Sequence, residues 1–115
     1  MIEIDRHMQN RSILRKTEYV RSRKYLNAAE DSFCVRCSSE VRPAVACHYT
    51  GLRQHDYGKG RGVKCHDICT ADLCDECHGY FDRPEINKSI EASEEFLHYI
   101  MLTIIRRVQN GIIKL

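Results

Sequence analysis

The stretches that decide the fold are two cysteine pairs with identical spacing, Cys34-Val-Arg-Cys37 and Cys74-Asp-Glu-Cys77. Each C-x-x-C turn supplies two thiolates at the separation that one zinc ion needs, and two such turns complete a tetrahedral shell. The spacing therefore predicts a single structural zinc ion whose four ligands are Cys34, Cys37, Cys74 and Cys77.

Length and composition agree with a metal-stapled domain. The chain has 115 residues, seven of them cysteine, and a net charge of +2. A domain of this size buries only part of its surface, so a metal would stabilise it. An odd number of cysteines argues against a closed set of disulfides, and residues 1–24 lack the apolar segment of a secretion signal. We therefore expect a cytoplasmic protein without a membrane span, because paired cysteines in a reducing compartment more often bind metal.

Other uses of the cysteines stay open. The run from Cys74 to His78 also spells the attachment pattern of a c-type haem, which would require export, and a C-x-x-C pair can carry redox chemistry. A second metal shell could be built from Cys65, His66 and Cys69 with Cys47 or His48. Otherwise the three cysteines outside the pairs are expected to fill the core as small apolar residues.

The chain is expected to divide into an arm and a domain. Residues 1–30 predict a basic N-terminal arm, because basic side chains outnumber acidic ones there, and residues 31–115 predict the zinc-containing domain. Within the domain, alternating side chains predict a strand over residues 44–50 that turns His48 away from the larger apolar residues. A second strand is expected within residues 65–73.

Two helices should follow the second cysteine pair. The first carries His78 and Asp82 one turn apart, and Pro84 limits its length. The second is expected over residues 89–110, with acidic residues in its first turns and arginines in its last, as the helix dipole favours. Its apolar stripe consists of Phe96, Leu97, Ile100, Met101, Ile104, Ile105 and Val108. The sequence thus predicts a small α+β domain whose C-terminal helix packs on the core or on a second subunit.

Basic side chains gather in two segments, and such clusters can follow a phosphate backbone. The candidate DNA-binding residues are Arg21, Arg23 and Lys24 in the arm, and Arg53, Lys59, Arg61 and Lys64 in the glycine-containing loop 51–64. A merely solvated arm and loop would show the same composition.

A second group of residues suits catalysis by a metal. His78 and Asp82 offer an imidazole and a carboxylate on one helix face, which suits Mg²⁺, Mn²⁺ or alternatively Zn²⁺ in an open site. His48 could act as a general base, and His66 or Asp67 could orient it or add a ligand. Such a base deprotonates water while the metal neutralises charge on a scissile phosphate, so together they could hydrolyse a phosphodiester.

The order of these motifs resembles the zinc-stapled HNH endonucleases, which have the ββα-metal fold, and more narrowly the YbcO-like family of lambdoid phage and prophage proteins. The matching stretches are Ala46–Leu52, Gly58–Lys64, His66–Ile68, Leu73–Arg83 and Asn110–Lys114. The resemblance implies a metal-dependent DNA endonuclease in the cytosol of a bacterial host. It assigns the general base to His48 and the catalytic metal to His78 with Asp82, and it places Asp67 in the catalytic site.

This chain departs from the HNH pattern in two places. Cys47 stands where many such enzymes carry an acidic residue or a histidine, and no central asparagine is obvious. Two other classes of function remain open: a non-catalytic zinc-ribbon module that binds nucleic acid, and a zinc-stapled adaptor for a phage or host recombination or replication protein. The sequence does not fix the oligomeric state or the choice between DNA and RNA.

Overall fold

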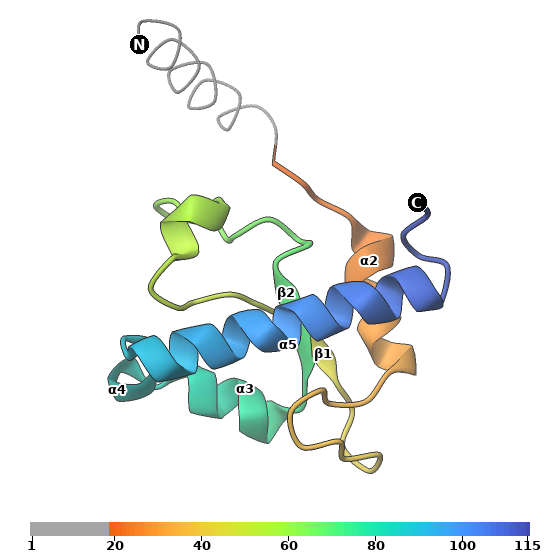
Figure 1. Cartoon of the computed structure of the whole chain (residues 1–115), viewed down its shortest axis with the longest axis horizontal. Coiled ribbons are helices and arrows are strands. Elements are labelled where there is room, and N and C mark those ends of the chain that lie inside the picture. The colour runs from red at the N-terminus through yellow and green to blue at the C-terminus, as the bar shows by residue number, and fades with distance from the viewer. Residues whose placement is uncertain (1–18) are drawn as a thin grey trace, which may run out of the picture.

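A two-stranded antiparallel sheet lies at the centre of the molecule, and helices surround it (Figure 1). This computed structural model describes residues 19–115, so residues 1–18 of the expected arm lie outside the described part. Strand β1 (Val45–His48) pairs with β2 (Thr70–Leu73), with Val45 opposite Leu73 and His48 opposite Thr70. The expected α+β class and both expected strands are confirmed.

The helices follow the sequence signals closely. Their bounds are α2 Arg23–Asn27, α3 Asp75–Asp82, α4 Pro84–Asn87 and α5 Ile90–Gln109, with 3-10 turns η1 Ala28–Asp31 and η2 Gln54–Tyr57. The α3 helix ends before Pro84, as predicted, but it begins at Asp75, inside the second cysteine pair rather than after it. The Ser89 hydroxyl caps α5 by accepting a hydrogen bond from the Ala92 N–H, and Gly111 follows the helix with a φ of +83°. These two signals explain why α5 starts and stops where the sequence predicted.

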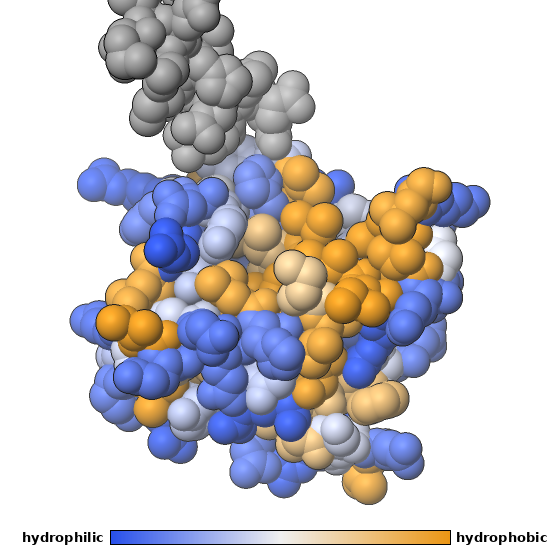
Figure 2. Space-filling model, in the orientation of Figure 1, coloured by the Kyte–Doolittle hydropathy of each residue, from blue (hydrophilic) through white to orange (hydrophobic). Residues whose placement is uncertain are grey.

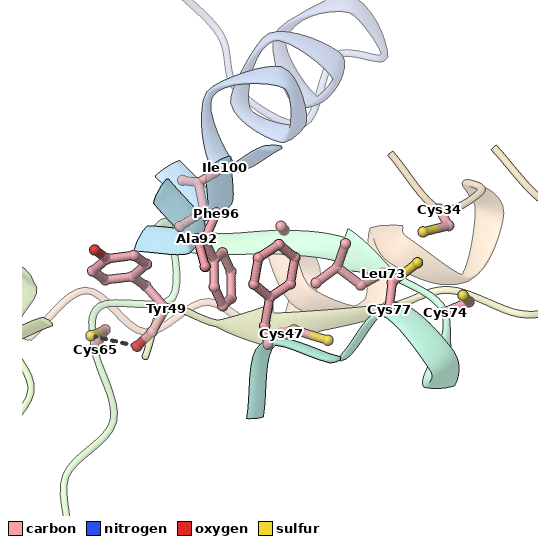
Figure 3. Close-up of a cluster of buried hydrophobic side chains, with 12 residues drawn as sticks. Cys34, Cys47, Tyr49, Cys65, Leu73, Cys74, Cys77, Ala92, Phe96 and Ile100 are labelled. Atoms are coloured by element: carbon pink, nitrogen blue, oxygen red, sulfur yellow. Dashed lines mark hydrogen bonds between the residues drawn. The ribbon is translucent and has the colours of Figure 1, made fainter. Parts of the chain in front are cut away.

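An aromatic cluster joins α5 to the sheet and to α3 (Figure 3). The ring of Phe96 lies 4.7 Å from that of Phe81 and 5.3 Å from that of Tyr49, and Leu73 and Ile100 fill the space beside them. These side chains come from β2, α3, α5 and, in the case of Tyr49, the position directly after β1. The apolar core is therefore the small region in which the two strands meet the two helices.

The buried face of α5 differs from the predicted stripe. Phe96 and Ile100 are buried as expected, but the buried line continues through Thr103 and Arg107, whereas Met101 and Ile105 are exposed. Figure 2 shows apolar surface over α5. An apolar stripe this wide exceeds what a two-stranded sheet can cover, and polar bonding to β2 decides which part of the helix turns inward.

That polar bonding is a buried ion pair between α5 and β2. The Arg107 guanidinium donates two hydrogen bonds to the Asp72 carboxylate, at 2.8 and 2.6 Å, and both side chains are fully buried. Its Nε also donates to the carbonyl of Tyr25, at 3.0 Å. The backbone N–H of Asp72 donates to Thr103 Oγ1 at 3.1 Å. Arg107 lies in the last turn of α5, as predicted, but its side chain is buried and bonds to β2 and α2 rather than facing solvent.

Residues 19–30, the described part of the expected arm, pack against the domain. Tyr25 and Ala29 are buried, and the Asp67 N–H donates to the carbonyl of Val20 at 2.9 Å. Within residues 19–115, none of the helices combines the length and the apolar character that crossing a bilayer would need.

Replacing Arg107 by methionine should lower the free energy of unfolding by about 3–5 kcal/mol, because the buried Asp72 would lose its two-bond partner and keep only the contact with Arg106, at 3.5 Å. Urea denaturation of Arg107→Met and of the exposed-site control Arg61→Met measures this effect. The Asp72→Leu/Arg107→Met double variant should recover much of the loss, since removing both charges also removes the unpaired one. An Arg107→Met protein as stable as the control would contradict this role.

Candidate functional site

Four thiols converge where β2 ends and α3 begins. Cys74 is the residue between them, Cys77 lies in the first turn of α3, and Cys34 and Cys37 approach from the loop before β1. The four Sγ atoms all lie within 4.8 Å of one another. Figure 3 shows Cys34, Cys74 and Cys77 grouped at one end of the core. The structure therefore brings together the four cysteines that the sequence paired by spacing.

The spacing of the sulfurs tests whether the cluster suits zinc. A tetrahedral ion with Zn–S bonds of about 2.3 Å separates its ligand sulfurs by about 3.8 Å. The Cys37 and Cys74 sulfurs are 3.7 Å apart. A disulfide would instead bring them to about 2.05 Å. All seven cysteines are free thiols, so this cluster could hold a structural zinc ion.

The thiols of the cluster differ in how readily they ionise. Burial acts to raise the pKa of Cys34, but hydrogen bonds from the peptide groups of Cys37, Cys74 and Arg36 outweigh it and lower the value to about 7. Burial raises the pKa of Cys77 to about 12. One thiolate is thus stabilised by the backbone while another resists ionising, and a cation would be needed to hold all four as thiolates.

Arg36 contacts the thiol cluster, which the zinc motif alone does not reveal. Its Nη1 donates to the sulfur of Cys77 at 3.5 Å, and its Nε lies 3.3 Å from the Glu95 carboxylate. Its guanidinium also lies 4.2 Å from the centre of the Tyr80 ring. Four thiolates around one zinc would carry a net charge of −2, which this arginine would partly offset. The available signal was a basic residue inside the first C-x-x-C pair.

The first cysteine turn ends in a left-handed residue. Ser38 has a φ of +58°, and its N–H donates to the Cys34 carbonyl at 2.9 Å. Residues with a side chain rarely adopt this conformation, because Cβ crowds the backbone. This strained conformation accompanies a turn that directs the thiols of Cys34 and Cys37 towards the same cluster.

We predict that the zinc site is needed for folding. A structural zinc contributes about 10–16 kcal/mol of apparent binding energy in small zinc peptides, which matches or exceeds the stability of most domains. Cys74→Ser should therefore lose stoichiometric zinc, measured by native mass spectrometry, and lose cooperative unfolding. Cys69→Ser, outside the cluster, should retain both. Full zinc occupancy in Cys74→Ser would contradict the ligand set.

Ser38→Gly should stabilise the protein by about 0.5–1 kcal/mol, since glycine adopts positive φ without the steric cost. Thermal unfolding of the zinc-loaded protein measures this gain. Glu40→Gly, a few residues on at an exposed position, is the control and should be neutral or slightly destabilising. A loss of stability in Ser38→Gly would show that the turn is not strained.

A second group of residues surrounds His48 at the end of β1. Its Nε2 lies 2.9 Å from Oδ1 of Asp67, in the loop that leads into β2. Asp67 also accepts a hydrogen bond from the Ser22 N–H at 2.7 Å and lies 3.4 Å from Arg21. Burial acts to raise the pKa of Asp67, but His48, Ser22 and Arg21 outweigh it and lower the value. Asp67 is therefore a carboxylate that contacts His48.

This pair opens onto a basic cleft of about 690 Å³. Its lining combines His48 and Asp67 with the basic residues Arg21, Arg23 and Lys64 and with Ser22, Leu26, Gly62 and Val63. Three of the seven candidate DNA-binding residues thus meet beside His48. His66 and Asp67 were both candidates for orienting His48. Asp67 contacts that histidine, whereas His66 accepts a hydrogen bond from the Val20 N–H at 3.0 Å.

The other candidate DNA-binding residues lie outside the cleft lining. Lys24 borders a separate hollow beside Asn110, and Arg53 lies 3.8 Å from Asp56 in another hollow. Arg61 is exposed and Lys59 is half-buried. The structure therefore gathers part of the predicted phosphate-binding set in one place and distributes the rest over the surface.

His78 and Asp82 form a separate pair on α3. His78 Nε2 lies 3.3 Å from Asp82 Oδ2, and the side chains are 41% and 52% exposed. Neither residue lines the cleft that contains His48. Within residues 19–115, the four-cysteine cluster is the only group of three or more histidine, cysteine or acidic side chains with the spacing of a metal site. The pair thus offers two ligands without a third.

The alternative second metal shell is not supported by the arrangement of residues 19–115. Burial raises the pKa of Cys47 to about 12 and that of Cys69 to about 11, so both remain neutral thiols. Cys65 is buried and donates to the carbonyl of Tyr49 at 3.2 Å. Cys47, Cys65 and Cys69 pack in or against the core, as expected for small apolar residues that fill it.

Comparisons with protein-family models, with curated proteins and with solved structures found no match for this chain. The described part of the chain contains a four-thiol cluster that could hold zinc, a histidine–carboxylate pair in a basic cleft, and a second such pair on α3.

Proposed function

We propose that the protein is a metal-dependent DNA endonuclease of the zinc-stapled HNH type, with the ββα-metal arrangement formed by β1, β2 and α3. The observation that carries this proposal is the contact between His48 and Asp67 inside a cleft bordered by Arg21, Arg23 and Lys64. A general base next to basic side chains suits hydrolysis of a phosphodiester. Four reduced thiols are compatible with work in the bacterial cytosol.

His48 acts as the general base in this mechanism. An ionised carboxylate can only accept hydrogen bonds, so the Asp67 contact places a proton on Nε2 of the imidazole. Nδ1 is then left with a free lone pair that can take a proton from water. Asp67 orients the ring and stabilises the positive charge that His48 gains as the water attacks, while its own low pKa keeps it charged.

His78 and Asp82 would hold the catalytic metal. Two ligand atoms bound at about 2.1 Å in adjacent octahedral positions lie about 3.0 Å apart, close to the 3.3 Å separation of this pair. Mg²⁺ and Mn²⁺ suit a site with few protein ligands, because water and phosphate oxygens complete the shell. When bound, the ion would neutralise charge on the scissile phosphate, which must then reach from the cleft beside His48 to the pair on α3.

The basic cleft would hold the substrate through its phosphates. Arg23 and Lys64 are exposed, and Arg61 lies next to the lining residue Gly62. Phosphate contacts position nucleic acid without reading its sequence. We therefore expect weak sequence preference or recognition of DNA structure, together with a steep loss of binding as salt rises.

The test is cleavage of supercoiled plasmid, branched DNA, single-stranded DNA and RNA by zinc-loaded protein with Mg²⁺, Mn²⁺ or EDTA. Loss of a general base lowers the rate by about 10²–10⁴-fold, so His48→Ala should fall in that range. His78→Ala should also lose activity, whereas His98→Ala, an exposed histidine of α5, should cleave like the wild type. Bound zinc is measured in every variant as the control for folding.

Absence of cleavage on every substrate, or equal cleavage by His48→Ala, would remove the catalytic proposal. Salt-dependent binding without cleavage would then indicate a nucleic-acid-binding module. Negligible binding would favour the adaptor alternative, for which the exposed apolar residues Ile90, Met101, Leu102 and Ile105 of α5 are the supporting observation.

A further inference from the structure

Residues 19–22, here called the N-terminal strap, lie against the loop that carries Asp67. The Val20 N–H donates to Nδ1 of His66 at 3.0 Å, and the Asp67 N–H donates back to the Val20 carbonyl at 2.9 Å. The ring of Tyr19 lies 5.5 Å from that of His66. The strap thus contacts this loop through backbone and side chains, more than forty residues away in sequence.

The strap also holds both oxygens of the Asp67 carboxylate. Oδ2 accepts the Ser22 N–H at 2.7 Å, while Oδ1 contacts His48 at 2.9 Å and Arg21 at 3.4 Å. The side chain of Asp67 is only 6% exposed, so the protein supplies these partners in place of water. A carboxylate held at both oxygens has little freedom to rotate, and it therefore fixes the imidazole that it contacts.

Arg21 makes its hydrogen bonds to acceptors within the protein. Its Nη1 donates to the Cys65 carbonyl at 2.8 Å and its Nη2 to the Lys64 carbonyl at 2.9 Å. The planar guanidinium joins two consecutive carbonyls to the Asp67 carboxylate, a geometry that a lysine ammonium cannot reproduce. An arginine engaged in this way has few donors left for a phosphate.

We propose that Arg21 is a positioning residue that fixes Asp67, and through it His48, rather than a phosphate ligand. This inference rests on the proposed function and changes the role that charge alone assigned to Arg21. It makes the N-terminal strap a structural part of the active site. Arg23, two residues on, lines the same cleft and remains the phosphate contact.

The first test separates kcat from KM for Arg21→Lys, Arg21→Gln and the matched variant Arg23→Gln. Misplacing a catalytic group lowers the rate of the chemical step, so both Arg21 variants should lose about 10-fold or more in kcat with KM changed less than about twofold. Arg23→Gln should instead raise KM and reduce the salt dependence of binding. Arg21→Lys that restores full activity, or a pure KM effect in Arg21→Gln, would overturn the proposal.

The second test does not depend on cleavage. Long-range ¹H–¹⁵N NMR of the zinc-loaded protein reports which ring nitrogen of neutral His48 carries the proton. The wild type and Arg23→Gln should show a single Nε2–H tautomer, and the two Arg21 variants should show a mixture. A single unchanged tautomer in all variants would contradict the positioning role. If the wild type cleaves nothing yet the tautomer responds to Arg21, the proposed function fails while the positioning of His48 stands.

Discussion

The four thiols at the junction of β2 and α3 are the constraint on which the rest of the structure depends. They join the loop before β1 to the end of β2 and to the first turn of α3. Every residue of β2 is buried, yet only Ala71 and Leu73 are apolar. A strand with so little apolar surface gains limited stability from the hydrophobic effect, so a zinc ion bound by the thiols at its end would contribute a large share of its stability.

The buried Asp72–Arg107 pair extends this support into the middle of the same strand. At the opposite end, the hydroxyl of Thr70 donates to the carbonyl of Asp67 at 2.9 Å. Between the thiol cluster and the His48 cleft, β2 is thus held by the ion pair at Asp72 and by the hydrogen bond of the Thr70 hydroxyl. The small core around Phe96 then adds the packing of α5 against Tyr49 and Phe81. This arrangement lets a short chain place an aspartate beside a histidine with little freedom.

Much of the fold could be predicted because its signals are local. The cysteine spacing predicted the cluster, Pro84 predicted the end of α3, and Ser89 with Gly111 fixed the bounds of α5. The inward face of α5 could not be predicted in the same way. An apolar stripe wider than the sheet leaves the helix rotation open, and the choice depends on Arg107 finding Asp72 across the fold, which no local pattern encodes.

The candidate site shows the same division. His48 and Asp67 were both candidates from sequence, but their contact depends on the loop that carries Asp67 folding back towards β1. The contacts of Arg21 and Arg36 depend on the positions of their guanidinium groups in the fold, which cannot be predicted from the charge of the sequence. The proposed metal pair on α3 was visible from its spacing of four residues, whereas its separation from the cleft lining was not.

The central claim is that zinc ligation by the four cysteines organises the domain, including the His48–Asp67 contact. The most direct test is a zinc titration of the reduced, metal-free protein, followed by ¹H–¹⁵N NMR. Dispersed amide signals and the Nε2–H signal of His48 should appear in one step that is complete at one equivalent of zinc. A dispersed spectrum with the His48 signal already present before zinc is added would contradict the claim.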